Sequence, residues 1–248
     1  MTAILAAEGL RRAFGALAVT RDVTLRVRAG EVHALIGPNG AGKSSLIAQL
    51  AGTLAPDAGR VRLDGADVTR LPAHARARRG LARTFQVSAL VGPMTALQNA
   101  ALAVQAHTSR PLAPFRRAAG DAALEEPARA ALHAVGLAER AETPAEALSH
   151  GERRALELAC ALASEPRVLL LDEPLAGMGH EEGRRIVALL AGLKGRFAML
   201  LVEHDMDAVF ALADRVSVLV AGRIIASGTP AEMRADATVR AAYLGEDA

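Results

Sequence analysis

A glycine-rich run near the N-terminus constrains the fold more than any other feature of the chain. It matches the pattern G-x-x-x-x-G-K-[ST], and its residues are Gly37, Pro38, Asn39, Gly40, Ala41, Gly42, Lys43 and Ser44. Residues 31–36 before it, which are apolar except for Glu31 and His33, predict a short buried strand that ends at Gly37. Leu46, Ile47 and Leu50 after it have the spacing of one helix face. A strand, a tight loop and a helix in this order predict an α/β protein.

The residue types in this loop suit an anion. Glycine lets backbone N–H groups turn inward around phosphate oxygens, and the positive end of the following helix would face the same place. Lys43 would bring a positive charge to the β- and γ-phosphates of ATP. Ser44 would bind Mg²⁺, and Ser45 would lie beside it in the nucleotide site. The alternative is a chance glycine-rich turn, since an ordinary chain of this length meets the bare pattern on the order of 1% of the time. The only lysines are Lys43 and Lys194, which weighs against coincidence.

A second motif joins an apolar strand to two carboxylates. Residues 168–171 are Val-Leu-Leu-Leu, and Asp172, Glu173 and Pro174 follow. Such a run is typical of a parallel strand buried on both faces, and ligands of parallel sheets collect at the carboxyl ends of strands. We expect Asp172 to reach Mg²⁺ beside Ser44, and Glu173 to orient or deprotonate the attacking water. Taken alone, the motif is explained equally well by a strand that ends in a solvated acidic turn.

The rest of the chain alternates between strand and helix patterns, which predicts a mostly parallel sheet with crossover helices. Residues 17–28 have period-two spacing and predict a β region near the N-terminus, and a hairpin is expected around Ala221-Gly222. The elements expected elsewhere are strands at 61–63, 81–85, 167–171 and 197–202, and helices at 71–80, 95–106, 121–135, 152–163, 181–193 and 205–212.

These elements predict one domain over residues 1–248. Residues 1–86 and 164–248 would form the α/β core of a P-loop ATPase, with a mostly parallel sheet and an antiparallel β region. Residues 87–163 are rich in helix formers and lack strand patterns, so we expect them to form a helical subdomain. Within this part, the prolines and arginines of residues 110–126 indicate a surface excursion that leads into a helix.

Composition limits the range of functions. The 29 basic and 27 acidic residues leave a formal charge of +2, which does not favour a nucleic-acid partner. The single cysteine, Cys160, lies in an apolar run, so we expect an inert buried thiol and a reducing compartment. The longest uncharged stretch, residues 84–109, contains too many polar residues for a membrane span, and the N-terminus lacks the features of an export signal. A role at a membrane would be that of a peripheral subunit on its cytoplasmic face.

Residues 148–152, Leu-Ser-His-Gly-Glu, resemble the signature L-S-G-G-Q of ATP-binding cassette (ABC) ATPases. They differ from it at His150 and Glu152. In that family the motif, here Ser149, Gly151 and Glu152, caps the γ-phosphate held by the opposite subunit, at a helix end that attracts anions. The resemblance therefore implies a dimer with composite sites. For this segment alone, an ordinary serine-capped helix is the alternative.

Further positions agree with the family pattern. Gln86 matches a glutamine that links the nucleotide to the membrane partner, His204 matches a histidine that contacts the γ-phosphate, and Phe14 lies where an aromatic ring stacks on adenine. Gly179 departs from the pattern, because Asp or Asn usually stands there and helps to couple the two sites. The resemblance implies a catalytic set of Lys43, Glu173 and His204, and a metal set of Ser44, Gln86 and Asp172.

Weaker motifs resemble one branch of the family, the ATP-binding subunits of branched-chain amino acid importers. They lie at residues 80–86, 94–99, 203–206 and 242–246, together with the basic excursion after residue 109. The resemblance implies a second cassette, identical or paralogous, together with membrane permease subunits and, indirectly, a solute-binding protein. Another amino acid, an amide or a urea-like solute stays open as the substrate.

Two other functions compete with transport. A non-transport ABC ATPase acting on nucleic acid or ribosomes would usually carry two cassettes or a long coiled-coil insertion, whereas this chain has one motif set. A module that holds ATP without hydrolysing it is disfavoured by the presence of both Glu173 and His204.

Overall fold

The computed structural model describes residues 3–84, 90–107, 121–236 and 239. Within them, a six-stranded sheet has the order β10-β9-β3-β8-β7-β6. Its strands are β3 (Val32–Ile36), β6 (Leu81–Arg83), β7 (Val168–Asp172), β8 (Ala198–Val202), β9 (Arg215–Val220) and β10 (Arg223–Gly228). The pairings are parallel except that of β9 with β10, which form the hairpin expected around residues 221–222. Every residue of β3, β7 and β8 is buried, and all of them except His33 and Asp172 are apolar, as is typical of parallel strands covered on both faces.

A second sheet is antiparallel and has the order β2-β1-β4-β5 within the described residues. Its strands are β1 (Ala3–Phe14), β2 (Leu17–Arg28), β4 (Ala58–Leu63) and β5 (Ala66–Asp67). The period-two spacing predicts no strand before residue 17, and the long strand β1 corrects that expectation. Register shifts interrupt β1 between Ala7 and Leu10 and again before Arg11, so its side chains do not keep the strict alternation by which strands are identified.

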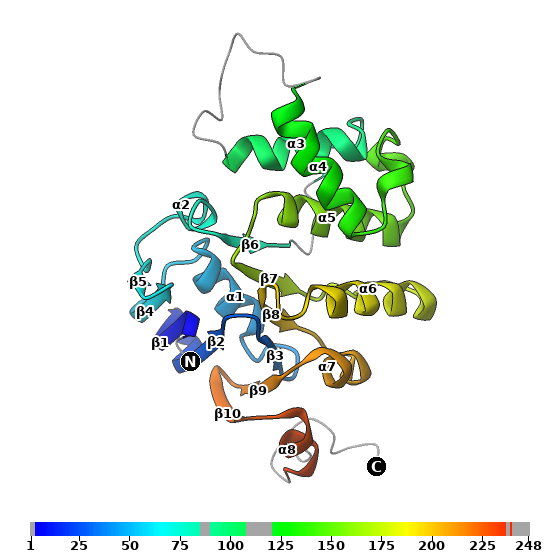
Figure 1. Ribbon diagram of the computed structural model, residues 1–248. Helices are drawn as coiled ribbons and strands as arrows, with labels where there is room; N and C mark the ends of the chain where they lie inside the picture. The colour runs from blue at the N-terminus through cyan, green and yellow to red at the C-terminus, as the bar shows by residue number, and fades with distance from the viewer. Residues whose placement is uncertain (1–2, 85–89, 108–120, 237–238, 240–248) are drawn as a thin grey trace.

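Helix α1 (Lys43–Ala51) lies between the two sheets (Figure 1). Its apolar residues Leu46, Ile47 and Leu50 share one core cluster with β1, β2 and β4 on one side and with Val168 and Leu170 of β7 on the other. The alternate residues of β7 face the opposite side of the sheet and pack against α6 (His180–Leu193). Asp172 continues the series of Val168 and Leu170, so strand alternation places it on the face that carries α1.

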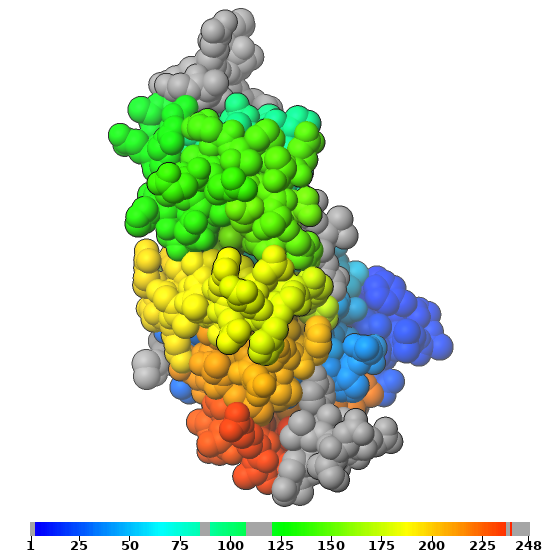
Figure 2. Space-filling model, turned by 90° about the vertical axis from the view of Figure 1, so that its right-hand side faces the viewer, coloured from blue at the N-terminus to red at the C-terminus, as the bar shows by residue number. Residues whose placement is uncertain are grey.

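The helices α3 (Ala96–His107), α4 (Ala122–Ala134) and α5 (His150–Ala163) pack together at one end of the molecule (Figure 1). Figure 2 shows this group next to α6, with the last helices at the other end. The remaining helical segments are α2 (Ala73–Ala77), η1 (Ala138–Arg140), η2 (Ala145–Ala147), α7 (Met206–Leu212) and α8 (Pro230–Ala235). None of the helices in the described residues combines the length and the apolar character needed to cross a bilayer.

Candidate nucleotide-binding site

The glycine-rich loop joins β3 to α1 in a backbone path that excludes side chains. Gly42 has a φ of 105°, and a Cβ there would lie 2.2 Å from the carbonyl oxygen of Val19. At Gly37 a Cβ would lie 2.0 Å from the carbonyl oxygen of Leu219. Because Gly42 is also the N-cap of α1, no side chain caps the N–H groups of the first turn. Uncapped N–H groups at the positive end of a helix are suited to binding an anion.

The side chain of Lys43 turns back toward the start of the glycine-rich loop. Its ammonium donates to the carbonyl oxygens of Gly37 and Pro38, at 2.6 and 3.0 Å, and the residue is 7% exposed. The pKa of Lys43 lies below its ordinary value, chiefly because burial removes water from it, while the carboxylates of Glu173 and Asp172 act in the opposite direction. The loop therefore holds a cation close to two acidic groups. Among the other loop residues, Pro38, Asn39 and Gly40 are exposed and Ala41 is buried.

The carboxyl ends of three adjacent strands bring the motifs together. The order β3-β8-β7 is parallel, so the glycine-rich loop after β3, the residues after β8 and the acidic end of β7 lie along one sheet edge. Asp172 ends β7 and has a fully buried side chain. Glu173 follows with a φ of 49°, and its N–H donates to the carbonyl oxygen of Val202 in β8 at 2.9 Å. A left-handed backbone at a non-glycine residue is uncommon and is concentrated at functional sites.

His204 follows β8 directly, and its side chain is 63% exposed. The residue before it, Glu203, is not among the predicted site residues, and its side chain is fully buried. Glu203 accepts hydrogen bonds from the N–H of Leu175 at 2.8 Å and from that of His204 at 3.0 Å. It therefore ties the loop after Glu173 to the loop that carries His204. A signal was present in the sequence, since a carboxylate directly follows the apolar residues 198–202.

The segment that resembles the signature motif begins α5. Ser149 is its N-cap and accepts from the N–H of Glu152, while Glu152 accepts from the N–H of Ser149 at 2.8 Å, so the two residues form a capping box. Helix α5 therefore begins at His150, two residues before the expected start. The pKa of Glu152 is lowered, first by its hydrogen bond from Arg140 and then by the N–H of Ser149. Gly151 joins Ser149 and Glu152 in lining a cavity of about 430 Å³ between the segment 135–140 that follows α4, helix α5 and helix α6, and the loop 37–44 does not contribute to it.

The other predicted positions are more scattered. Ser44 is exposed in the first turn of α1, and Ser45 is half-buried next to it. Phe14 lies at the end of β1, 49% exposed, with the guanidinium of Arg12 4.9 Å from its ring centroid. Gln86 lies outside the described residues. Gly179 is the N-cap of α6 with a φ of −68°, and nothing lies within 4 Å of a Cβ built there, so aspartate would fit without strain.

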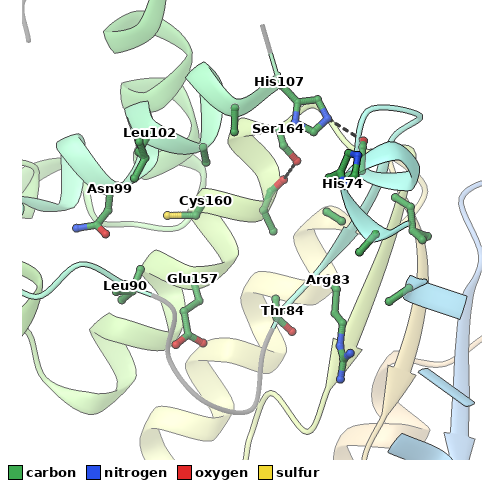
Figure 3. A pocket seen from close by; sticks show the side chains of 18 of the residues that line it. His74, Arg83, Thr84, Leu90, Asn99, Leu102, His107, Glu157, Cys160 and Ser164 are labelled. Carbon is green, nitrogen blue, oxygen red and sulfur yellow. Dashed lines mark hydrogen bonds between the residues drawn. The ribbon is translucent and has the colours of Figure 1, made fainter. Parts of the chain in front are cut away.

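A cavity of about 470 Å³ lies between α3, α5 and the end of β6. Figure 3 shows its labelled side chains, with Asn99 and Leu102 from α3, Glu157 and Cys160 from α5, and Arg83 and Thr84 at and just after the end of β6. No residue of the loop 37–44 lines it. Cys160 is half-buried, and burial raises the pKa of its thiol to about 12, which keeps it protonated.

Comparisons with known proteins agree with this geometry. Residues 20–176 match the family described as "ABC transporter", and residues 223–248 match "Branched-chain amino acid ATP-binding cassette transporter". The chain is 38% identical to the high-affinity branched-chain amino acid transport ATP-binding protein BraF of Pseudomonas aeruginosa, with 98% of each chain covered. It is 34% identical to the lipopolysaccharide export system ATP-binding protein LptB of Acidithiobacillus ferridurans, with 99% of this chain and 98% of LptB covered.

Among solved structures, the ADP conformation of an ATP-binding cassette of an ABC transporter superimposes with a TM-score of 0.87 at 28% identity. The superposition covers 99% of this chain and all of that one. The fold, the edge on which the motifs meet and the sequence matches lead to one conclusion. The chain belongs to the ABC transporter family and is an ATP-hydrolysing ATP-binding subunit of it.

Proposed function

We propose that this chain uses ATP hydrolysis to drive the import of branched-chain amino acids through a membrane permease. The observation that carries the catalytic part is the convergence of the glycine-rich loop, the acidic end of β7 and His204 at the carboxyl ends of β3, β7 and β8. The importer part is supported by the 38% identity to BraF and by the match of residues 223–248.

The proposed roles follow from position and chemistry. Lys43 and the N–H groups of α1 bind the phosphates, and Phe14 stacks on adenine. Glu173 orients or deprotonates the attacking water, and His204 contacts the γ-phosphate. Catalysis then consists mainly of positioning and of stabilising charge that develops on the transferring phosphoryl group.

The residues present fit Mg²⁺ bound together with a nucleotide. Oδ1 of Asp172 is buried and accepts no hydrogen bond from the described residues, and Ser44 offers an exposed hydroxyl. The described residues contain no group of three His, Cys, Asp or Glu side chains that could hold a metal alone. One carboxylate plus phosphate oxygens is the arrangement that Mg²⁺ favours, and we include Gln86 in the proposed set. When bound, Mg²⁺ would neutralise charge on the β- and γ-phosphate oxygens.

We further propose that the active unit is a head-to-tail dimer, with an identical or paralogous cassette. Each site would combine the residues above with Ser149, Gly151 and Glu152 of the opposite subunit. Their position at the start of α5, where the helix end favours anions, supports this assignment. The subunit would bind permease subunits at the cytoplasmic face of the membrane, with residues 87–163 acting as a helical subdomain of the single domain.

A second candidate, an export ATPase, is favoured by the 34% identity to LptB. The two functions require different partners, because an importer of this kind works with a solute-binding protein. We expect that a complex purified by a tag on this chain contains a permease that transports leucine, isoleucine or valine. Recovery of a complex that extracts lipid from vesicles instead would decide for export.

Glu173→Gln tests the catalytic assignment. We expect the variant to bind ATP within about twofold of the unchanged chain but to lose at least a hundredfold in turnover, because the amide cannot act as the base. Equilibrium binding and phosphate release measure the two effects. Glu139→Gln, the same change at an exposed position, is the control and keeps normal turnover. Normal hydrolysis by Glu173→Gln would refute the assignment, and a folded chain that binds no MgATP would refute the whole proposal.

A further inference from the structure

An ion pair connects the end of β6 to the carboxylate at the end of β7. Nη2 of Arg83 donates to Oδ2 of Asp172 at 2.9 Å. The Asp172 side chain is fully buried and that of Arg83 is 18% exposed. Arg83 and Asp172 are 89 residues apart in the chain, and the parallel pairing of β6 with β7 brings them together. Figure 3 shows the Arg83 side chain extending from the end of β6.

The two oxygens of Asp172 have different surroundings. Oδ2 is engaged by the guanidinium, whereas the buried Oδ1 accepts no hydrogen bond from the described residues. A buried carboxylate is costly without a charged or hydrogen-bonding partner, so the guanidinium compensates the charge and also limits rotation of the carboxylate. A ligand held in this way presents one oxygen in a defined direction, as partners behind metal ligands do.

The same strand end is held through the backbone. The N–H of Thr84, directly after Arg83, donates to the carbonyl oxygen of Leu170 at 3.0 Å. Leu170 also pairs with Arg83 in the parallel register, two residues before Asp172. The chain that leaves β6 toward Gln86 is therefore joined to β7 by a backbone hydrogen bond and by the ion pair.

We propose that Arg83 is a positioning residue for the metal carboxylate: it holds Asp172 so that Oδ1 is directed to the Mg²⁺ that accompanies ATP. The inference rests on the proposed use of Asp172 in MgATP binding. Arg83 touches neither the nucleotide nor the metal in this arrangement and acts through Asp172. The planar guanidinium is suited to this task, because its donors have a fixed direction that a lysine ammonium lacks.

The test compares nucleotide binding with and without metal. The affinity of the purified full chain for a non-hydrolysable fluorescent ATP analogue is measured in saturating Mg²⁺ and in EDTA, and the ratio of the two affinities gives the effect of the metal. We expect Arg83→Met to reduce this ratio roughly tenfold or more, the usual loss when a partner behind a metal ligand is removed. The affinity in EDTA should stay within about twofold, because the phosphate loop is unchanged.

Two further variants separate positioning from a structural effect. Arg83→Lys keeps the charge and should recover part of the lost ratio, and it provides the measurement if Arg83→Met does not fold. Arg167→Met removes a hydrogen bond of 2.6 Å between the exposed side chains of Arg167 and Asp64. It should leave the ratio of the two affinities unchanged. An unchanged or increased ratio in both Arg83 variants would overturn the inference while leaving the ATPase function intact. Failure of the unchanged chain to bind the analogue with Mg²⁺ would instead refute the proposed function.

Discussion

At the scale of single residues, Glu203 shows how one buried carboxylate organises two loops. It accepts from the N–H of Leu175, two residues after Glu173, and from the N–H of His204. The N–H of Asp205 lies 3.5 Å from the same oxygen that accepts from His204. An acceptor with two ionised oxygens suits several converging N–H donors, and hydrogen bonds to charged groups contribute about 1.5–3 kcal/mol.

We expect Glu203→Gln to lower turnover about tenfold or more, with ATP affinity within about threefold. The amide keeps the size of the side chain but turns an N–H₂ group toward backbone N–H donors, so at least one hydrogen bond is lost, at about 1–3 kcal/mol for the unsatisfied group. Turnover and binding are measured separately, because a positioning role moves the first more than the second. Equal losses in both would show that Glu203 only supports the fold.

At the scale of elements, α1 has an open N-terminus and a firmly capped C-terminus. Arg76, which is 1% exposed, donates to the carbonyl oxygens of Gln49 and Leu50 in the last turn, both at 2.7 Å. It also donates to the carbonyl oxygens of Thr69 and Leu71, at 2.8 and 3.0 Å. Carbonyl groups at a helix C-terminus have no partner within the helix, and a cation there is favoured by the helix dipole.

Arg76→Met should lower the free energy of unfolding by about 3–5 kcal/mol, because four carbonyl groups lose their charged donor. Urea denaturation measures the change. Arg79→Met is a suitable control, since Arg79 is exposed and its side chain donates to the carbonyl oxygen of Ala75 at 3.3 Å. Similar unfolding midpoints for the two variants would contradict the capping role.

At the scale of the whole molecule, His33 joins the two sheets. It lies in β3, with Nδ1 3.0 Å from the carbonyl oxygen of Arg26 in β2 and Nε2 2.8 Å from Oγ of Ser217 in β9. The carbonyl oxygen can only accept, so Nδ1 carries the proton. Its pKa is lowered to about 4, chiefly by burial, with Arg215 and Arg28 acting in the same direction and the hydrogen bond to Arg26 opposing it.

This shift makes stability depend on pH. The unfolded chain protonates His33 near its ordinary pKa of about 6.5, whereas the folded chain does so only near 4, so the unfolded state binds more protons between these values. The contribution of neutral His33 is complete above about pH 6.5 and is lost as pH falls toward 4. We expect about 2 kcal/mol less stability at pH 5 than at pH 7 from this group.

Urea denaturation at the two pH values tests this prediction. His33→Gln should show a smaller difference between pH 7 and pH 5 than the unchanged chain, even though its stability at pH 7 is reduced. His133→Gln, at an exposed position on α4, should keep the original difference. If the His33 variant also kept the original difference between pH 7 and pH 5, another group would be responsible for the loss of stability at low pH.

Much of the fold and of the site could be predicted from local patterns. The loop 37–44, the buried strand before Asp172 and the hairpin around residues 221–222 lie where the sequence places them. They share a cause, since glycine conformation, apolar runs and turns act within a few residues. Strand β1 was not predicted, because its register shifts break that local rule, and α5 begins at His150, two residues before the expected Glu152, because Ser149 is its N-cap.

The amino-acid sequence alone therefore determined the chemistry available at the site: a glycine-rich loop, a cation at Lys43, and carboxylates at the end of one apolar strand. Only the tertiary structure decided which groups meet. The strand order places Arg83 against Asp172 and Glu203 between two loops, across 89 and 28 residues of chain, and the packing of α2 places Arg76 at the end of α1, across 26 residues. Such partners leave no periodic trace in the sequence, because a buried charge is satisfied by whatever the packing of distant elements brings within hydrogen-bond distance.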